Sequence, residues 1–432
     1  MNDLHQMAHA AHLAALEAAA SPREQRDDAL LRMIDALQAH KDQIFAANAQ
    51  DLAQAEKDAL AAPLLSRLRF GEEKLRQVCD GLRALRELPD PLGETTLARE
   101  LTEGLKLYRV TCPIGVIGVV FESRPDALVQ IASLAIKSGN AVLLKGGREA
   151  LGTNRALCEA VREAVAAAGL PIDLAQLLTT RDDVAAMLKE DRDIDLIIPR
   201  GSNAFVRYIM DNSRIPVLGH ADGLCHVYVD RAADPEMAVR LTVDSKAQNV
   251  SVCNAAETLL VHRDIAAAFL PLLRPAMEEK HVTLVGDARA QALLGCEPAT
   301  EEDWHTEYLD YKLSVRVVDS LQEAIAHINA YGSHHTDLIV TEDREAAAAF
   351  MRQVDSAGVY HNVSTRFADG FVYGFGAEVG IATGKLHVRG PMGLDGLTTY
   401  KYKLLGSGQT MAEMKSGART YTHRLLDEDC PL

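Results

Sequence analysis

Aromatic side chains are scarce in this sequence of 432 residues: they make up 5% of it and include one tryptophan. Positive charge is also in short supply, since 45 lysines and arginines are outnumbered by 61 aspartates and glutamates, giving a formal net charge of −16. This balance excludes a general nucleic-acid coat and a polybasic membrane binder. No apolar run approaches the roughly 20 residues that span a bilayer, and the first residues carry no secretion signal. We therefore expect a cytoplasmic protein with no nucleic-acid or membrane partner.

The seven cysteines are an odd number, and no two of them form a Cys-x-x-Cys pair. A disulfide framework and a structural zinc site are therefore not expected, and the thiols should stay free in a reducing compartment. His5, His9 and His12 are spaced to share one helix face, but a metal ion there would also need a carboxylate. The pair His334-His335 precedes a strand and has no cysteine partner. We therefore expect no metal site.

The sequence is rich in aliphatic side chains, since 48% of its residues are hydrophobic and few of them are aromatic. Its length suits two or three domains. Residues 1–100 are predicted to be helical, with one helix start at Ser21, which would cap it, and Glu24, which would close a capping box. From about residue 110, short apolar runs alternate with helical segments, which indicates two series of parallel, doubly wound α/β units. A late strand at 397–405 has no place in either series. The predicted strands lie at 116–121, 141–144, 177–178, 196–198, 217–218, 257–262, 282–285, 313–318 and 337–341, and the main helices between them at 126–138, 155–168, 235–247, 264–279, 320–330 and 344–354.

Cys253 follows the helical segment 235–247 and precedes the strand at 257–262, at the junction of the two proposed domains. A free thiol at a domain interface can meet substrate and cofactor together, as a nucleophile must. The alternative is a buried apolar thiol. Spacing alone does not separate Cys253 from Cys225 or Cys112 as the reactive cysteine.

No Gly-x-Gly-x-x-Gly motif follows a predicted strand, so the usual dinucleotide fingerprint is missing. Two other segments lie where parallel strands end, the edge at which open α/β sheets bind ligands. One is the Lys-Gly-Gly segment 145–147, whose ammonium could hold ribose or phosphate oxygens; the alternative is an exposed lysine at the end of a strand. The other is the Arg-Gly-Ser segment 200–202, where Ser202 would cap a helix whose free N–H groups face a pyrophosphate. A plain helix cap is the alternative there.

Four stretches together resemble the aldehyde dehydrogenase superfamily, whose cofactor domain dispenses with that glycine motif, and within it the γ-glutamyl phosphate reductase family. They are spread over nearly the whole chain: residues 113–126 (PIGVIGVVFESRPD), 244–254 (DSKAQNVSVCN), 329–337 (NAYGSHHTD) and 374–401, which begins GFGAEVG and ends GLTTYK. The resemblance implies an α/β protein with two doubly wound domains, one for the cofactor and one catalytic, and a small β oligomerisation flap.

The same resemblance suggests a division of the chain and a homo-oligomer built through the flap. The expected cofactor-binding domain comprises residues 1–104 and 124–250 with a return segment near 366–390, the catalytic domain 251–365, the flap 105–123 and 391–410, and the C-terminal tail 411–432.

The resemblance also assigns roles to residues. Cys253 is the expected nucleophile, and Asn254 and neighbouring backbone N–H groups are expected to stabilise the oxyanion. Hydrolytic members of the superfamily keep a water-activating glutamate where a hand alignment places His220, and an oxyanion-hole asparagine where it places Arg124. A guanidinium suits a phosphate or a carboxylate, which it binds with two parallel hydrogen bonds. The expected substrate-binding residues are Ser123, Arg124 and His220, and the expected cofactor-binding residues are Lys145, Gly146, Gly147, Gly201, Ser202 and Glu378.

The implied reaction is the reduction of L-glutamyl 5-phosphate to L-glutamate 5-semialdehyde and phosphate in proline biosynthesis, with NADP(H) as cofactor and a thioacyl intermediate on Cys253. The alternatives are a hydrolytic aldehyde dehydrogenase and a non-catalytic relative. The lability of glutamyl phosphate would favour functional coupling to glutamate 5-kinase. Because both ligands are anionic and the chain carries −16, we expect a locally positive cleft at Arg124, Lys145 and Arg200.

Overall fold

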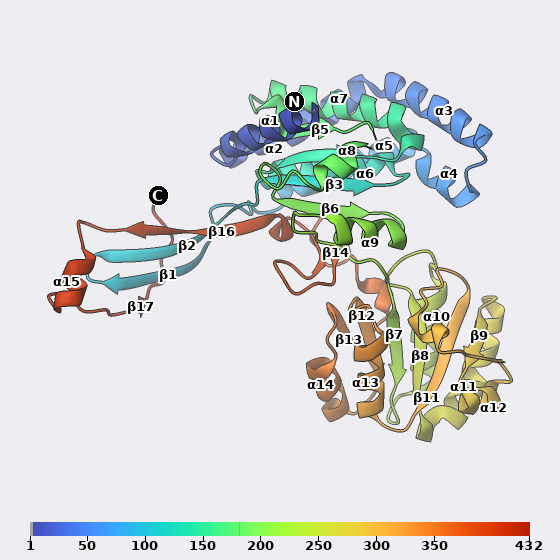
Figure 1. Cartoon of the computed structure of the whole chain (residues 1–432). Coiled ribbons are helices and arrows are strands. Elements are labelled where there is room, and N and C mark those ends of the chain that lie inside the picture. The colour runs from blue at the N-terminus through green and yellow to red at the C-terminus, as the bar shows by residue number, and fades with distance from the viewer. Residues whose placement is uncertain (1–2, 181) are drawn as a thin grey trace.

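The computed structural model describes residues 3–180 and 182–432, and its larger sheets have four, seven and four strands (Figure 1). The N-terminal helices lie over the first sheet: α1 contacts its strands and buries Leu4, Ala8 and Ala11 in their core, whereas α2 packs on the helices that cover the sheet. None of the helices in the described part of the chain is long and apolar enough to cross a membrane. The N-terminal helices are α1 (Asp3–Ala18), α2 (Arg23–Ala39), α3 (Lys41–Lys57), α4 (Ala62–Leu68) and α5 (Glu72–Glu87).

The start of α2 differs from the expected capping box. The Ser21 hydroxyl donates to the Ala18 carbonyl oxygen at 2.6 Å, and Pro22 occupies the N-cap position with no side-chain cap. Because Pro22 fixes an extended backbone one residue later than expected, Ser21 finishes the preceding turn instead of starting the next helix.

The first sheet is parallel, in the order β5-β4-β3-β6, and every residue of β3 and β4 is buried. Helix α6 is buried along nearly its whole length against this sheet, which explains its lack of a polar face. The carboxyl ends of the strands therefore share one edge, as the sequence predicts. The elements are β3 (Val116–Phe121), α6 (Pro125–Lys137), β4 (Ala141–Lys145), α7 (Leu151–Ala167), β5 (Ala175–Leu177), α8 (Asp182–Met187), β6 (Leu196–Arg200) and α9 (Asn203–Asn212).

The second sheet is also parallel, in the order β10-β9-β11-β8-β7-β12-β13. It contains β7, so the segment 225–250, expected in the first domain, belongs to the second. The reason is that β7 is buried between β8 and β12, and the Asp337 carboxylate accepts the His226 N–H at 2.8 Å. The elements are β7 (Cys225–Val229), α10 (Pro235–Ala247), β8 (Ala256–His262), α11 (Arg263–Glu279), β9 (Thr283–Gly286), α12 (Ala288–Leu294), β10 (Glu297–Pro298), β11 (Lys312–Val318), α13 (Leu321–Tyr331), β12 (Thr336–Val340), α14 (Arg344–Gln353) and β13 (Gly358–His361).

The third sheet is antiparallel, in the order β16-β2-β1-β17, and extends from the body as an arm (Figure 1). The expected flap boundaries were wrong at both ends, since residues 95–102 belong to the arm and residues 116–121 form the buried strand β3 of the first sheet. The late strand at 397–405 pairs with β2 of its own chain, and part of the expected tail pairs with β1. The strands are β1 (Thr95–Thr102), β2 (Leu105–Pro113), β16 (Thr398–Leu405) and β17 (Arg424–Leu425), with α15 (Met411–Ser416) between the last two.

The glycine-rich segment after β13 returns to the first domain. Its apolar residues Val379, Ala382 and Met392 join the core of the first sheet. A short antiparallel pair within it, β14 (Ile381–Ala382) with β15 (Gly390–Pro391), lies where the two α/β domains meet (Figure 1). This return brings a backbone carbonyl of β14 to the candidate site.

Candidate active site

Cys253 lies in the turn between α10 and β8, and its side chain is half-buried. The segment leading into β7 packs directly on this turn: a Cβ on Gly223 would meet the Cys253 carbonyl oxygen at 2.3 Å and the Cys253 Cα at 2.5 Å. Two residues further along the same segment, the buried Cys225 thiol donates to the Cys253 carbonyl oxygen at 3.3 Å. The backbone of the candidate nucleophile is therefore held by the segment that leads into β7.

Asn254 does not have the free amide that the oxyanion role requires. Its Nδ2 donates to the carbonyl oxygens of Ala368 at 3.0 Å and Arg366 at 3.4 Å, and its own carbonyl oxygen accepts the Thr365 hydroxyl at 2.7 Å. Both amide hydrogens are engaged by the segment after β13. Asn254 therefore ties the nucleophile turn to that segment, and oxyanion donors must come from backbone N–H groups.

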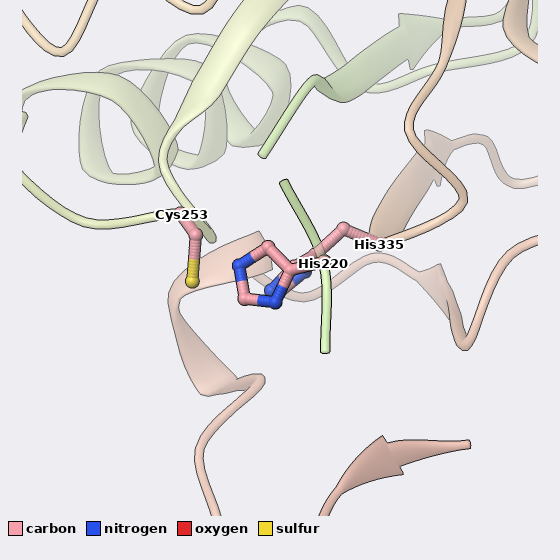
Figure 2. A group of neighbouring side chains, drawn as sticks. All are labelled: His220, Cys253 and His335. Atoms are coloured by element: carbon pink, nitrogen blue, oxygen red, sulfur yellow. The ribbon is translucent and has the colours of Figure 1, made fainter. Parts of the chain in front are cut away.

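Two imidazoles lie beside the thiol. His220, His335 and Cys253 each offer a nitrogen or sulfur atom, and the three atoms lie within 4.8 Å of one another (Figure 2). His220 Nδ1 is 2.9 Å from the Ile381 carbonyl oxygen of β14, and the two rings meet edge to face with centroids 5.0 Å apart. His220, which the hand alignment places where hydrolytic relatives keep the water-activating glutamate, therefore does lie at the thiol and brings an imidazole to it.

Two arginines share the electrostatic surroundings of Cys253. Burial lowers the pKa of Arg200, and the charge of Arg124 lowers it further, whereas Glu378 and a thiolate at Cys253 act in the opposite direction. Burial also lowers the pKa of Arg366, again opposed by a thiolate at Cys253. An anion placed between these guanidinium groups would relieve their desolvation.

Arg366 was not predicted from the sequence. It comes from the turn after β13, and no motif marks that turn; only the fold brings it to the nucleophile. Arg124, which was predicted, is the N-cap residue of α6, and its side chain is about half exposed, 3.7 Å from the Asp126 carboxylate. Glu378 accepts the Gly370 N–H at 2.9 Å; burial raises the pKa of its carboxyl, while Arg200 and His220 oppose that rise. Glu378 therefore lies within the electrostatic reach of Arg200 and His220.

A cleft of about 520 Å³ opens at the carboxyl ends of β3 and β4 and is lined in part by residues 145–149. The Lys145 ammonium, almost fully buried, donates to the Gly146 carbonyl oxygen at 2.6 Å. A Cβ on Gly146 would fall 2.1 Å from Nδ2 of the buried Asn154, and neither amide atom of Asn154 has a partner among the described residues. A glycine backbone beside a lysine at the mouth of the cleft is a fitting cradle for the ribose and phosphate oxygens of a dinucleotide.

Two carboxylates occupy the same edge and alter two sequence expectations. Glu122 accepts the Ser202 N–H at 3.2 Å, and the Ser202 side chain makes no cap bond, so the start of α9 is occupied by a carboxylate. A Cβ on Gly201 would also meet Glu122, at 3.0 Å. Glu149 accepts both the N–H and the hydroxyl of Ser123, at 2.8 and 2.6 Å. Ser123 lines the dinucleotide cleft with its hydroxyl engaged, so the structure does not direct it to the substrate.

The structure thus has a candidate nucleophile in the turn before β8 and, at the edge of the first sheet, a cleft that fits a nucleotide, which is the layout expected of a cofactor-dependent enzyme that works through a cysteine. A family model described as the aldehyde dehydrogenase family matches residues 1–295. Proteins named γ-glutamyl phosphate reductase are 57% identical in Pelotomaculum thermopropionicum (99% of this chain, 98% of that one) and 57% identical in Acetivibrio thermocellus (97% of each). The chain therefore belongs to the aldehyde dehydrogenase superfamily and, within it, to the γ-glutamyl phosphate reductase family.

Solved structures agree with this family. The crystal structure of γ-glutamyl phosphate reductase from Thermotoga maritima is 36% identical, with a TM-score of 0.93 over 95% of this chain and 100% of that one. An acetylating aldehyde dehydrogenase from Geobacillus thermoglucosidasius, 15% identical with a TM-score of 0.65 over 95% and 97% of the two chains, shares the fold. The two-domain architecture with an antiparallel arm is thus that of the superfamily.

Proposed function

We propose that this protein reduces L-glutamyl 5-phosphate to L-glutamate 5-semialdehyde and phosphate, with NADPH as the cofactor, as the second step from glutamate to proline. The observation that carries the proposal is a half-buried Cys253 in the turn before β8, with the guanidinium groups of Arg200 and Arg366 within its electrostatic reach. The similarity to named γ-glutamyl phosphate reductases over nearly the whole chain supports it.

The Cys253 thiolate attacks the acyl carbon of glutamyl phosphate, the C–O bond to phosphate breaks, and a thioester forms on the sulfur. Arg200 and Arg366 hold the departing phosphate or the substrate carboxylate, and Arg124 adds to their field. Backbone N–H groups of the turn that contains Cys253 stabilise the oxyanion, while Asn254 holds that turn in place. Reduction and collapse of the thiohemiacetal release the semialdehyde and regenerate the thiolate.

The nicotinamide cofactor supplies the hydride when bound. Lys145 and the glycines 146 and 147, which line the cleft, would hold its ribose and phosphate oxygens. Arg148, which also lines the cleft, is the side chain placed to favour an extra phosphate on the ribose, and hence NADPH over NADH.

Water must not take the place of phosphate in the reverse reaction. A hydrolytic enzyme activates water with a carboxylate near the thioester, and here the aligned position is His220, whose Nδ1 is held by the Ile381 carbonyl oxygen. The aligned position thus carries no carboxylate, and relatives that match nearly the whole chain are named γ-glutamyl phosphate reductase, so the hydrolytic alternative is not favoured.

The decisive experiment runs the reaction in reverse, with semialdehyde and NADP. Cofactor reduction should require added phosphate and should vanish in Cys253→Ser. The control is Cys112→Ser, the same substitution at a half-buried cysteine of β2, and it should keep wild-type activity. Equal rates with and without phosphate would overturn the proposal in favour of hydrolysis, and activity that survives Cys253→Ser would overturn the assigned nucleophile.

The arm is the proposed oligomerisation surface of a homo-oligomer. Strand β16 forms one edge of its sheet, and Tyr400, Tyr402 and Leu404 are more than half exposed on it. An open, partly apolar strand edge is a surface that a second copy can pair with. A cytoplasmic location and functional coupling to glutamate 5-kinase complete the proposal, because a labile acyl phosphate is best consumed where it is made.

A further inference from the structure

Three segments far apart in the sequence bring metal-binding side chains to one point. His220 precedes β7, Cys253 precedes β8 and His335 precedes β12, and their ligand atoms lie within 4.8 Å of one another. Figure 2 shows the thiol of Cys253 and the ring of His220 side by side, with His335 next to that ring. No spacing in the sequence predicts this cluster, because its three residues lie in three separate segments.

The hydrogen bonds of the two imidazoles leave a nitrogen on each for another partner. His220 Nδ1 faces the Ile381 carbonyl oxygen at 2.9 Å, and since a carbonyl only accepts, Nδ1 carries the proton and Nε2 the lone pair. His335 is 1% exposed, and its Nδ1 lies 2.9 Å from the Thr336 hydroxyl. Its buried Nε2 has no hydrogen-bond partner among the described residues, which is unfavourable unless a ligand satisfies it.

We propose that His220, His335 and Cys253 bind a divalent, thiophilic cation of the Zn²⁺ class, which reversibly blocks the nucleophile. Two neutral imidazoles and a thiolate are ligands that Zn²⁺ prefers, and a hydrogen bond from the far nitrogen to a carbonyl, as on His220, is the usual orienting contact of a metal-bound histidine. With bond lengths of about 2.0–2.3 Å, tetrahedral ligand atoms lie about 3.3–3.6 Å apart. The three atoms therefore close by up to about 1.5 Å, through rotation of the half-buried Cys253 and His220 side chains.

The surrounding charges set the strength of this site. Arg200 and Arg366 repel a cation, and the fourth position is left to solvent, so binding is weaker than in a closed four-ligand site. A sulfur bonded to the metal cannot attack an acyl carbon, so the bound cation silences the enzyme and shields the thiol from alkylation. The metal site rests on geometry alone, and only its inhibitory effect rests on the proposed function.

Cobalt(II) tests the site without substrate, because a thiolate bound to Co²⁺ gives a charge-transfer absorption band. One Co²⁺ per chain should produce the band, Zn²⁺ should displace it, and Cys253→Ser should abolish it. His335→Gln should weaken Co²⁺ affinity at least about tenfold while the metal-free enzyme keeps its activity. The control is His5→Asn, which alters a separate surface group of His5, Glu190 and Asp193 and should leave the band unchanged.

A second measurement covers the case in which His335→Gln fails to fold. In the wild-type protein, Zn²⁺ should slow alkylation of Cys253 and leave that of Cys112 unchanged, as peptide mapping would show. A band that survives Cys253→Ser, an affinity unaffected by folded His335→Gln, or equal protection of both cysteines would overturn the proposal. A protein that shows the band but no reductase activity would keep the metal site and refute the proposed function.

Discussion

Gly223 offers the sharpest test of how the nucleophile is held. A Cβ at this position would meet the carbonyl oxygen, Cα and carbonyl carbon of Cys253 at 2.3, 2.5 and 2.7 Å. These atoms are backbone, so no side-chain rotation relieves the contact, and the two segments must separate by roughly 1 Å to reach ordinary van der Waals distance. Because a misplacement of about 1 Å costs on the order of 10²-fold in rate, Gly223→Ala should lower kcat/KM about a hundredfold.

The assay is phosphate-dependent oxidation of the semialdehyde, combined with urea unfolding. Overpacking should cost about 1–3 kcal/mol of stability, so the variant stays folded and its loss of rate is read separately. Gly81→Ala is the matched control, because the exposed Gly81 of α5 has nothing within 4 Å of its added Cβ. It should keep full activity and gain up to about 1 kcal/mol. A Gly223→Ala enzyme within about threefold of wild type would refute the contact and with it this account of the turn.

Two further predictions concern buried ionisable side chains in the second domain. Lys246 and Glu257 are fully buried with Nζ and Oε2 2.5 Å apart, so Lys246→Met should destabilise the protein by about 3–5 kcal/mol in urea unfolding, and adding Glu257→Gln should recover more than half of this loss. Burial lowers the pKa of His327 to about 2, so His327 is neutral when folded but binds a proton when unfolded below pH 6.5. The stability that depends on a neutral His327 is therefore fully present above that pH and is lost as the pH falls. The free energy of unfolding should drop by about 2 kcal/mol between about pH 6.5 and 5 for this reason. Relative to wild type, His327→Phe should gain that amount over the same interval, and a difference independent of pH would contradict it.

The sheet-forming segments could be predicted because their physics is local. Continuous apolar runs such as 116–121 are buried on both faces of a parallel sheet, and the helices between them carry their own start and stop signals. Which sheet a strand joins is not a local property: β7 looks like any other strand of the first series. Only its buried pairing with β8 and β12 assigns it to the second domain.

The candidate site could be predicted to the same extent. Lys145 and the segment 200–202 follow from the rule that parallel strands end at one edge of the sheet. Arg366 and the closeness of His335 to Cys253 depend on loops that the fold alone brings together. Ser202 and Asn254 were predicted in functional roles from their types, but their donors are satisfied by Glu122 and by backbone carbonyls. A residue type indicates what a side chain can do, and its hydrogen-bond partners decide what it does.

Because the protein carries a net charge of −16 and is expected to bind anionic ligands, the location of its positive charge matters. Lys145 and Arg148 in the dinucleotide cleft are formally balanced by Glu122 and Glu149 in the same lining, so that cleft is not strongly positive. We expect the positive field to be concentrated instead at the nucleophile, where Arg124, Arg200 and Arg366 act together and the nearby carboxylates of Glu378, Asp126, Asp244 and Asp369 offset them only in part. Salt screens such a field within about 10 Å at 0.1 M ionic strength. Raising salt should therefore increase the KM for phosphate in the reverse reaction by a larger factor than the Kd for NADPH, measured by cofactor fluorescence. An equal or larger effect on NADPH would place the dominant positive field in the cofactor cleft and refute this distribution.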